Sequence, residues 1–401
     1  MGFYRHNLYL AFNFFVFRLA KLIVQIFGAR ALPVASFGLF SYLYSLMDIW
    51  VHLFGFGLDI AASRAHGLAA DWRELWKKAA FWKLLLSVLG ALIGLIALPW
   101  PYSLIFGVWH IGFMQSKLAY SLVNTLLYPK GLVIAGFAAE TVLVAVALLA
   151  TKIWGLAGFV SAFALERAVE ALGLWRAATL REPALAEHWN CSGMKNAARR
   201  LFPGASWLWA NQLLGILAAR LDIVLVKMFL GLESLALYSL SFRLAEAPLF
   251  LFAAMADSTF AYFVRHRKDQ ESLYAGHVKK ALVLGFVCAA ALTAFAFLGA
   301  GLVLGPKYAG IAPFLAAYSW VLVLRGANMV SSSFLAAAGR EKALLASSAA
   351  GVGFSGLRRA PTGPRGHLFH RGQASAPHRD ASLSHGWAGR LVSGCFPVWG
   401  R

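Results

Sequence analysis

The sequence predicts an all-α polytopic membrane protein, because it combines an excess of apolar residues, long apolar runs, and basic clusters that alternate between those runs. Hydrophobic residues make up 60% of the 401 residues, whereas charged residues make up only 13%. Soluble domains are about 45–50% apolar and about 25% charged, so this chain has too few charges for a fully water-exposed surface. Apolar runs close to the roughly 20 residues that a transmembrane helix needs recur up to about residue 352.

The apolar runs form two series, which predict two bundles of transmembrane helices. The first predicts an N-terminal six-helix bundle over 1–176, with spans at about 8–29, 36–59, 79–99, 103–126, 131–151 and 155–176. The second predicts an incomplete C-terminal bundle over 205–352, with spans at about 205–230, 235–262, 281–304 and 311–337. An eleventh run begins near residue 343 and stops early. The longest connection, 177–204, is expected to be a cytoplasmic linker.

Lys and Arg residues cluster in alternate connections, and this pattern predicts the orientation of the chain. Clusters follow the second, sixth, eighth and tenth spans and contain Arg64, Arg73, Lys77, Lys78, Arg176, Arg181, Lys195, Arg199, Arg200, Arg265, Arg267, Lys268, Lys279, Lys280, Arg340 and Lys342. The odd-numbered connections are nearly bare, with single cations at Arg30, Lys152 and Lys307. Because cytoplasmic connections are enriched in Lys and Arg, we expect a cytoplasmic N-terminus in the cell (inner) membrane. Because so many of the Lys and Arg residues behind the net charge of +20 lie in short clusters between apolar runs, nucleic acid is not expected as a partner.

The last stretch, 353–401, departs from this pattern. It is rich in Arg, His and Pro, contains no Lys, Ile, Asn or Tyr, and shows no helical period. Such a stretch is either a disordered basic tail or an out-of-frame translation, and its abrupt start within the eleventh apolar run favours the second interpretation. Neither its His residues nor the cysteines Cys191, Cys288 and Cys395 have the spacing of a metal site. We therefore expect no metal and no cofactor.

Ionisable side chains also fall inside the predicted spans, where an unpaired charge is costly. The cations are Arg18, Lys21, Lys117, Arg220, Arg243 and Arg325, and the acids include Asp48, Glu140, Asp222 and Glu246. One interpretation places the cations in a water-filled cavity that binds an anionic substrate, since Arg can donate two parallel hydrogen bonds to a phosphate. The other is internal ion pairing, for example between Arg243 and Glu246, which share one helix face. The acids then serve in pairing or in coupling transport to an ion.

Three stretches resemble the polysaccharide flippases of the multidrug/oligosaccharidyl-lipid/polysaccharide exporter (MOP) superfamily. The first is FGLFSYLYSLMDIWVHLFGFGLDIAASR at 37–64, which is similar to the second span of that family. The second, RLDIVLVKMFLGLESLALYSLSFRLAE at 220–246, resembles its seventh and eighth spans through Arg220, Asp222, Tyr238 and Arg243. The third runs from Tyr308 to Arg340 and ends in FLAAAGREKA, like the tenth span and the turn after it.

The resemblance implies a MATE-like MOP architecture of two bundles with both termini cytoplasmic and a cationic cavity. It implies a transporter rather than an enzyme, one that flips a lipid-pyrophosphate-linked oligosaccharide across the cytoplasmic membrane for synthesis of O-antigen, capsule or exopolysaccharide. The implied partners are a polyprenyl-pyrophosphate oligosaccharide, membrane lipids and other polysaccharide-assembly proteins. This chain departs from the family pattern near the start of its eleventh span, which leaves the second bundle incomplete.

Other functions remain open at this point. A MATE-type cation-coupled drug exporter has the same architecture, and the acids Asp48, Glu140 and Asp222 would suit it. A membrane polysaccharide polymerase or ligase is the alternative from the enzyme class. Such enzymes generally carry a large external loop or an acidic motif outside the membrane, whereas the predicted outer connections here are short.

The interrupted eleventh run gives a prediction about the gene. If the residues from about 353 are out of frame, resequencing the DNA for residues 340–401 and reading all three frames will reveal a frame that continues with two apolar spans. Absence of such a frame would mean that the basic tail is genuine.

Overall fold

The structure is a computed structural model that describes residues 3–68, 71–187, 192–253, 255–256 and 270–337. Its regular elements are all helical within these ranges. They are α1 (Phe3–Ala31), α2 (Val34–Gly55), α3 (Leu58–Leu68), α4 (Trp72–Ala97), α5 (Tyr102–Thr125), α6 (Pro129–Arg181), η1 (Pro183–Leu185), α7 (Met194–Glu246), α9 (Gln270–Leu298), α10 (Ala300–Leu304), η2 (Pro306–Ile311), α11 (Ala312–Ser319) and α12 (Val321–Ala337).

The two longest helices, α6 and α7, each contain one glycine with a left-handed backbone. Gly155 has φ +56° and Gly231 has φ +80°, a conformation that glycine adopts without the steric cost that a Cβ brings. The glycine divides α6 near the boundary between the predicted spans 131–151 and 155–176, and divides α7 between 205–230 and 235–262. Each long helix is therefore two predicted spans joined at a sharp bend.

The remaining predicted spans also coincide with helices. Six stretches among the described residues are long and apolar enough to cross a membrane: Val34–Gly55, Trp72–Ala97, Pro129–Arg181, Ala219–Glu246, Tyr274–Leu298 and Ala312–Leu335. Helices α1 and α5 cover the predicted spans 8–29 and 103–126. The all-α polytopic fold is thus confirmed. The eleventh run from 343 and the tail 353–401 lie outside the described residues.

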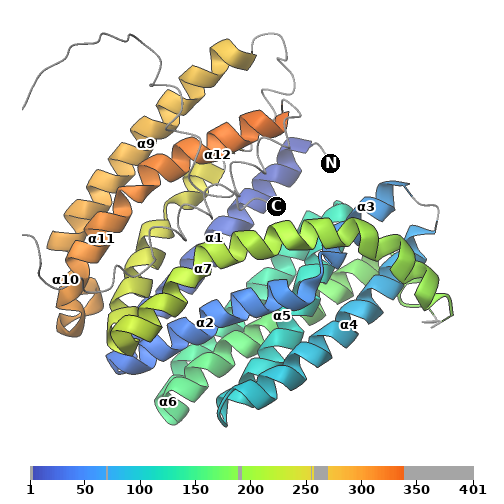
Figure 1. The fold of residues 1–401 in the computed structure, drawn as a ribbon, viewed down its shortest axis with the longest axis horizontal. Coiled ribbons are helices and arrows are strands. Elements are labelled where there is room, and N and C mark those ends of the chain that lie inside the picture. Colours follow the sequence, from blue (N-terminus) through green and yellow to red (C-terminus); the bar gives the residue numbers. More distant parts are fainter. Residues whose placement is uncertain (1–2, 69–70, 188–191, 254, 257–269, 338–401) are drawn as a thin grey trace, which may run out of the picture.

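The helices pack as an N-terminal group, which includes α1 to α6, and a C-terminal group, which includes α7 to α12. The two groups meet along α2 and α7. Helix α5 packs against both α4 and α6, and α9 packs against α11 and α12. Helix α7 runs beside α2, and α1 lies against α6 (Figure 1). An aromatic cluster fills the core next to α2, where the ring of Phe40 lies 4.7 Å from that of Phe159 and 4.9 Å from that of Phe163.

The α2–α7 junction includes a backbone approach that only glycine permits. A Cβ on Gly38 would lie 1.9 Å from the carbonyl oxygen of Leu232, directly after the bend of α7. Backbone atoms cannot rotate away as a side-chain tip can, so any larger residue must separate the two helices. The missing side chain of Gly38 therefore sets the distance between α2 and α7 at this end of the junction.

Gly38→Ala should destabilise the fold by about 1–3 kcal/mol, because overpacking forces backbone movement. Thermal unfolding of the purified protein in detergent measures the effect. Gly107→Ala is the matched control: its Cβ would meet the Ala91 Cβ at 3.6 Å, an ordinary contact, and alanine favours the helix. Equal melting temperatures for both variants would contradict the tight contact.

Candidate functional site

The junction between α2 and α7 contains a buried ion pair. Nη2 of Arg220 lies 2.8 Å from Oδ2 of Asp48, and both side chains are largely buried. Arg220 comes from α7 and Asp48 from α2, so the pair joins the two groups of helices. Losing one partner of a buried pair strands a charge at low dielectric, which makes this contact a strong constraint on the junction.

A second ion pair joins α7 to α12. Nη1 of Arg325 lies 2.6 Å from Oε1 of Glu246, at the end of α7. The acid that the sequence offered as a same-helix partner for Arg243 is therefore held by an arginine from another helix. Both Arg220 and Arg325 also lie over the ring of Phe242, at 5.7 Å and 5.8 Å from its centroid.

Arg243 differs from these two arginines. Its guanidinium carbon lies 4.4 Å from the ring centroid of Tyr44 and 5.5 Å from that of Phe40, both on α2. Its Nη2 is buried and has no hydrogen-bond partner, and no carboxylate of the described residues forms an ion pair with it. Aromatic faces attract a guanidinium, but they accept none of its conventional hydrogen bonds. Nη2 of Arg243 is thus a positively charged hydrogen-bond donor at the junction that has no acceptor.

Asp222 takes part in a chain of hydroxyl groups beside this junction. The Tyr238 hydroxyl donates to its Oδ2 at 2.5 Å, and the backbone N–H of Ile223 donates to its Oδ1 at 2.9 Å. Tyr318, on α11, donates in turn to the Tyr238 hydroxyl oxygen. These hydrogen bonds link α11 to α7 and fix the orientation of the Asp222 carboxylate.

Lys21 belongs to a separate network between α1 and α6. Its Nζ lies 3.0 Å from Oε1 of Glu166 and 3.4 Å from Oε1 of Glu140. Arg167 lies 3.6 Å from Glu166 and forms an ion pair with Glu170. The network is largely buried, and all of its members come from the N-terminal group of helices.

Lys117 lies in a third cluster, among α2 to α5. Its Nζ is 3.1 Å from Nε2 of His52, whose Nδ1 lies 2.6 Å from the backbone oxygen of Asp48. Lys83 and Asp59 form an ion pair at 3.6 Å in the same part of the molecule. This cluster adjoins the junction through the backbone oxygen of Asp48.

The six cations that the sequence predicts to line a cavity therefore lie in several different parts of the structure. Arg220, Arg243 and Arg325 share the junction of α2, α7 and α12. Lys21 and Lys117 lie in ion networks of the N-terminal group, and Arg18 is exposed on α1. The predicted acids are divided in the same way, with Asp48 and Glu246 at the junction, Asp222 beside it, and Glu140 next to Lys21.

Aromatic side chains at the junction were missed by the charge-based reading of the sequence. Tyr44 precedes Asp48 by four residues and therefore shares its helix face, so helical spacing could have identified it. Phe242 adjoins Arg243, and nothing in the sequence separates it from the many other Phe residues. Its contact with both Arg220 and Arg325 depends on how α7 bends and meets α12.

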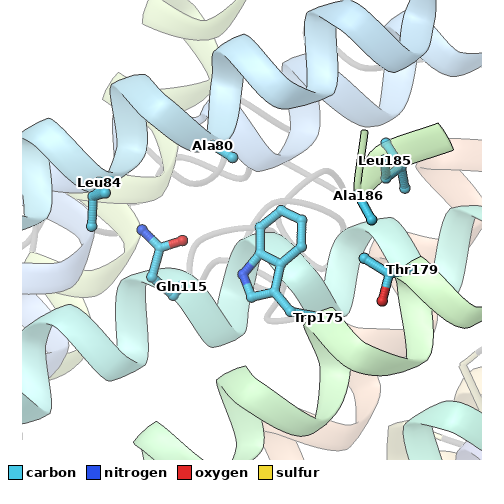
Figure 2. A pocket seen from close by; sticks show the side chains of 7 residues that line it. All are labelled: Ala80, Leu84, Gln115, Trp175, Thr179, Leu185 and Ala186. Carbon is cyan, nitrogen blue, oxygen red and sulfur yellow. The ribbon is translucent and has the colours of Figure 1, made fainter. Parts of the chain in front are cut away.

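A cavity of about 310 Å³ lies elsewhere, between α4, α5, α6 and the residues around η1 (Figure 2). Its walls are mainly apolar and comprise Ala80, Leu84, Gln115, Trp175, Thr179, Leu185 and Ala186. Nε2 of Gln115 is buried there without a hydrogen-bond partner. No charged side chain lines this cavity, so it lacks the groups that would bind an anion.

The Lys21 network gives a stability prediction. Lys21→Met leaves Glu140 and Glu166 facing each other without the ammonium between them, and we expect a loss of about 3 kcal/mol in unfolding free energy. Arg18→Met, at an exposed position three residues earlier, should change it by about 0.5 kcal/mol or less. Chemical denaturation in detergent compares the two variants, and similar losses would show that the network contributes little.

Comparisons with known proteins agree with this architecture. The sequence matches the family model described as "Polysaccharide biosynthesis protein" over residues 5–267. No curated protein matches it. Similar solved structures include the inward-facing conformation of a multidrug resistance MATE family transporter of the MOP superfamily, with 18% identity, a TM-score of 0.60, and coverage of 87% of this chain and 88% of that chain.

Two further solved structures show the same likeness. A MATE transporter crystallised in complex with MaL6 is 16% identical, with a TM-score of 0.60 and coverage of 88% of this chain and 87% of that chain. A eukaryotic MATE transporter is 13% identical, with a TM-score of 0.52 and coverage of 88% and 87%. At such identities the likeness shows the fold, and the family match covers well over half of the sequence. This chain therefore belongs to the family described as "Polysaccharide biosynthesis protein", and it has the fold of the MATE transporters.

Proposed function

We propose that this MOP-family transporter flips a lipid-pyrophosphate-linked oligosaccharide across the cytoplasmic membrane for cell-surface polysaccharide synthesis. Arg243 is the residue that contacts the anionic pyrophosphate. In this proposal the N-terminus is cytoplasmic, as the alternating basic clusters predict. The substrate enters between the two groups of helices, and its lipid tail stays in the bilayer.

The uncommitted guanidinium of Arg243 is the observation that carries the proposal. Arg220 and Arg325 already form ion pairs at 2.8 Å and 2.6 Å, whereas the buried Nη2 of Arg243 donates to nothing. An unpaired charge within a span is costly and marks functional positions by default. A pyrophosphate would supply the oxygen acceptors that the rings of Tyr44 and Phe40 cannot.

The surroundings of Arg243 are suited to holding it ready for such a ligand. The two rings limit the rotamers of its side chain, so less conformational entropy is lost when an anion binds. Because of its planar fork, a guanidinium can donate two parallel hydrogen bonds to one phosphate. Tyr44 and the nearby tyrosines could also contact sugar rings, which combine apolar faces with hydroxyl groups.

Arg243→Gln tests the assignment, because it should separate binding from stability. We expect affinity for a short-chain polyprenyl-pyrophosphate oligosaccharide to fall at least about tenfold, since charge-assisted hydrogen bonds are lost. The melting temperature should stay the same or rise, because an uncompensated buried charge has been removed. Arg220→Gln should instead lower the melting temperature, since it strands Asp48.

Lys227→Gln is the matched control for binding. Lys227 is also a cation of α7, and its Nζ lies 5.0 Å from the ring centroid of Tyr42, a different ring of α2 from the two that contact Arg243. Purified proteins in detergent are titrated with the fluorescent substrate. Unchanged affinity in Arg243→Gln, or an equal loss in Lys227→Gln, would reject Arg243 as the anion contact.

A MATE-type drug exporter is the second candidate, because the fold is shared and the junction holds the acids Asp48 and Glu246. These acids are already paired with arginines, which leaves them less available to an organic cation. Binding of a lipophilic cation such as ethidium distinguishes the two functions. A drug exporter would bind ethidium with an affinity that Arg243→Gln leaves unchanged or improves.

A further inference from the structure

A single lysine bridges the two groups of helices at one end of the molecule. Lys307, in η2, donates from Nζ to the backbone oxygens of Arg30 and Leu32, both at 2.7 Å. These carbonyls lie at the C-terminal end of α1, where a helix has no further N–H groups to satisfy its last oxygens. A cation there also interacts favourably with the negative end of the helix dipole.

The contacts next to Lys307 close the same end. Tyr308 is 0% exposed, and its ring packs edge-on against Phe37 of α2 at 6.3 Å between centroids. The backbone of Leu232 lies directly against Gly38, one residue further along α2. We call Lys307, Tyr308, Phe37, Gly38 and Leu232 the end seal.

The end seal joins segments that are far apart in sequence but lie at one end of the bundle. It combines the connection between α1 and α2, the bend of α7 after Gly231, and η2, which follows α10. Figure 1 places α10, the start of α2 and the bend of α7 at this end. These segments are odd-numbered connections of the predicted topology, which carry few Lys and Arg residues. The predicted orientation therefore puts this end of the molecule on the side away from the cytoplasm.

We propose that Lys307 is a latch that holds this end closed and must release both α1 carbonyls when the end opens during transport. The proposal rests on the proposed transport function, because carrying a substrate across the membrane requires this end to open at some stage. Lys307 is the seal's only charged member. The other contacts in the seal are apolar packing and backbone proximity.

The exposure of Lys307 suits a reversible contact. Its hydrogen bonds lie partly in contact with water, which can replace them when the end opens. The buried pair between Arg220 and Asp48 has no such replacement. The latch therefore holds the seal strongly enough to favour the closed end, without trapping it there.

A cysteine placed just inside the seal reports opening. Ser41 lies one turn beyond Gly38 on α2, is 0% exposed, and has a buried hydroxyl without a hydrogen-bond partner. Ser41→Cys is a small change that replaces this hydroxyl with a thiol. It is introduced after Cys191, Cys288 and Cys395 have been replaced by serine, and its reaction with a hydrophilic maleimide is timed in detergent.

Lys307→Met should raise the labelling rate about tenfold, since two charge-assisted hydrogen bonds are lost. Lys307→Gln, which keeps a polar donor, should give a smaller increase and is measured in case the Met variant folds poorly. Lys152→Met removes the exposed cation beside the Gly155 bend of α6 and should leave the rate unchanged.

Equal rates in Lys307→Met, Lys307→Gln and the parent protein would overturn the latch, and so would an equal rise in Lys152→Met. The labelling assay contains no substrate. Failure of the latch is therefore distinguishable from failure of the proposed function, which would appear as unchanged substrate affinity in Arg243→Gln.

Discussion

Burial of charge among apolar helices is the constraint on which the arrangement of this molecule depends. Desolvating a carboxylate or guanidinium costs several kcal/mol, and only a well-placed partner offsets it. Asp48 and Arg220 meet this requirement across the α2–α7 junction at 2.8 Å, and Glu246 and Arg325 meet it between α7 and α12 at 2.6 Å. Helices that supply such partners cannot separate without stranding a charge, so the first pair fixes how the two groups of helices meet and the second fixes how α7 meets α12.

The same constraint makes Arg243 informative. The rings of Tyr44 and Phe40 attract its guanidinium but offer no conventional hydrogen-bond acceptor. Nη2 of Arg243 therefore remains an unsatisfied donor in the folded protein. Ligand-binding sites often retain polar groups without protein partners at a cost in stability, because a group that already has all its hydrogen-bond partners within the protein cannot bond to a ligand. An anion at Arg243 would complete the pattern of paired charges that the rest of the junction already follows.

The helices could be predicted from the sequence, whereas the partners of the charges could not. Each apolar run near 20 residues gives a helix because backbone groups in a bilayer must bond within their own segment. Even the bends at Gly155 and Gly231 fall near predicted span boundaries. Pairing depends instead on where helices cross. Arg243 and Glu246 are three residues apart on α7, yet Glu246 pairs with Arg325, which α12 brings to it from 79 residues away.

The two classes of contact between the groups of helices differ in how easily they break. At the α2–α7 junction, Arg220 and Asp48 form a largely buried pair, and separating them leaves a charge at low dielectric. At the end, Lys307 donates to carbonyls near the surface, where water can take its place. Opening should therefore begin at the end seal while the Arg220–Asp48 pair stays intact, so that this pair acts as a pivot. Arg243 of α7 lies over the rings of Tyr44 and Phe40 of α2, so the anion proposed to bind it would lie against both helices whose relative angle changes on opening.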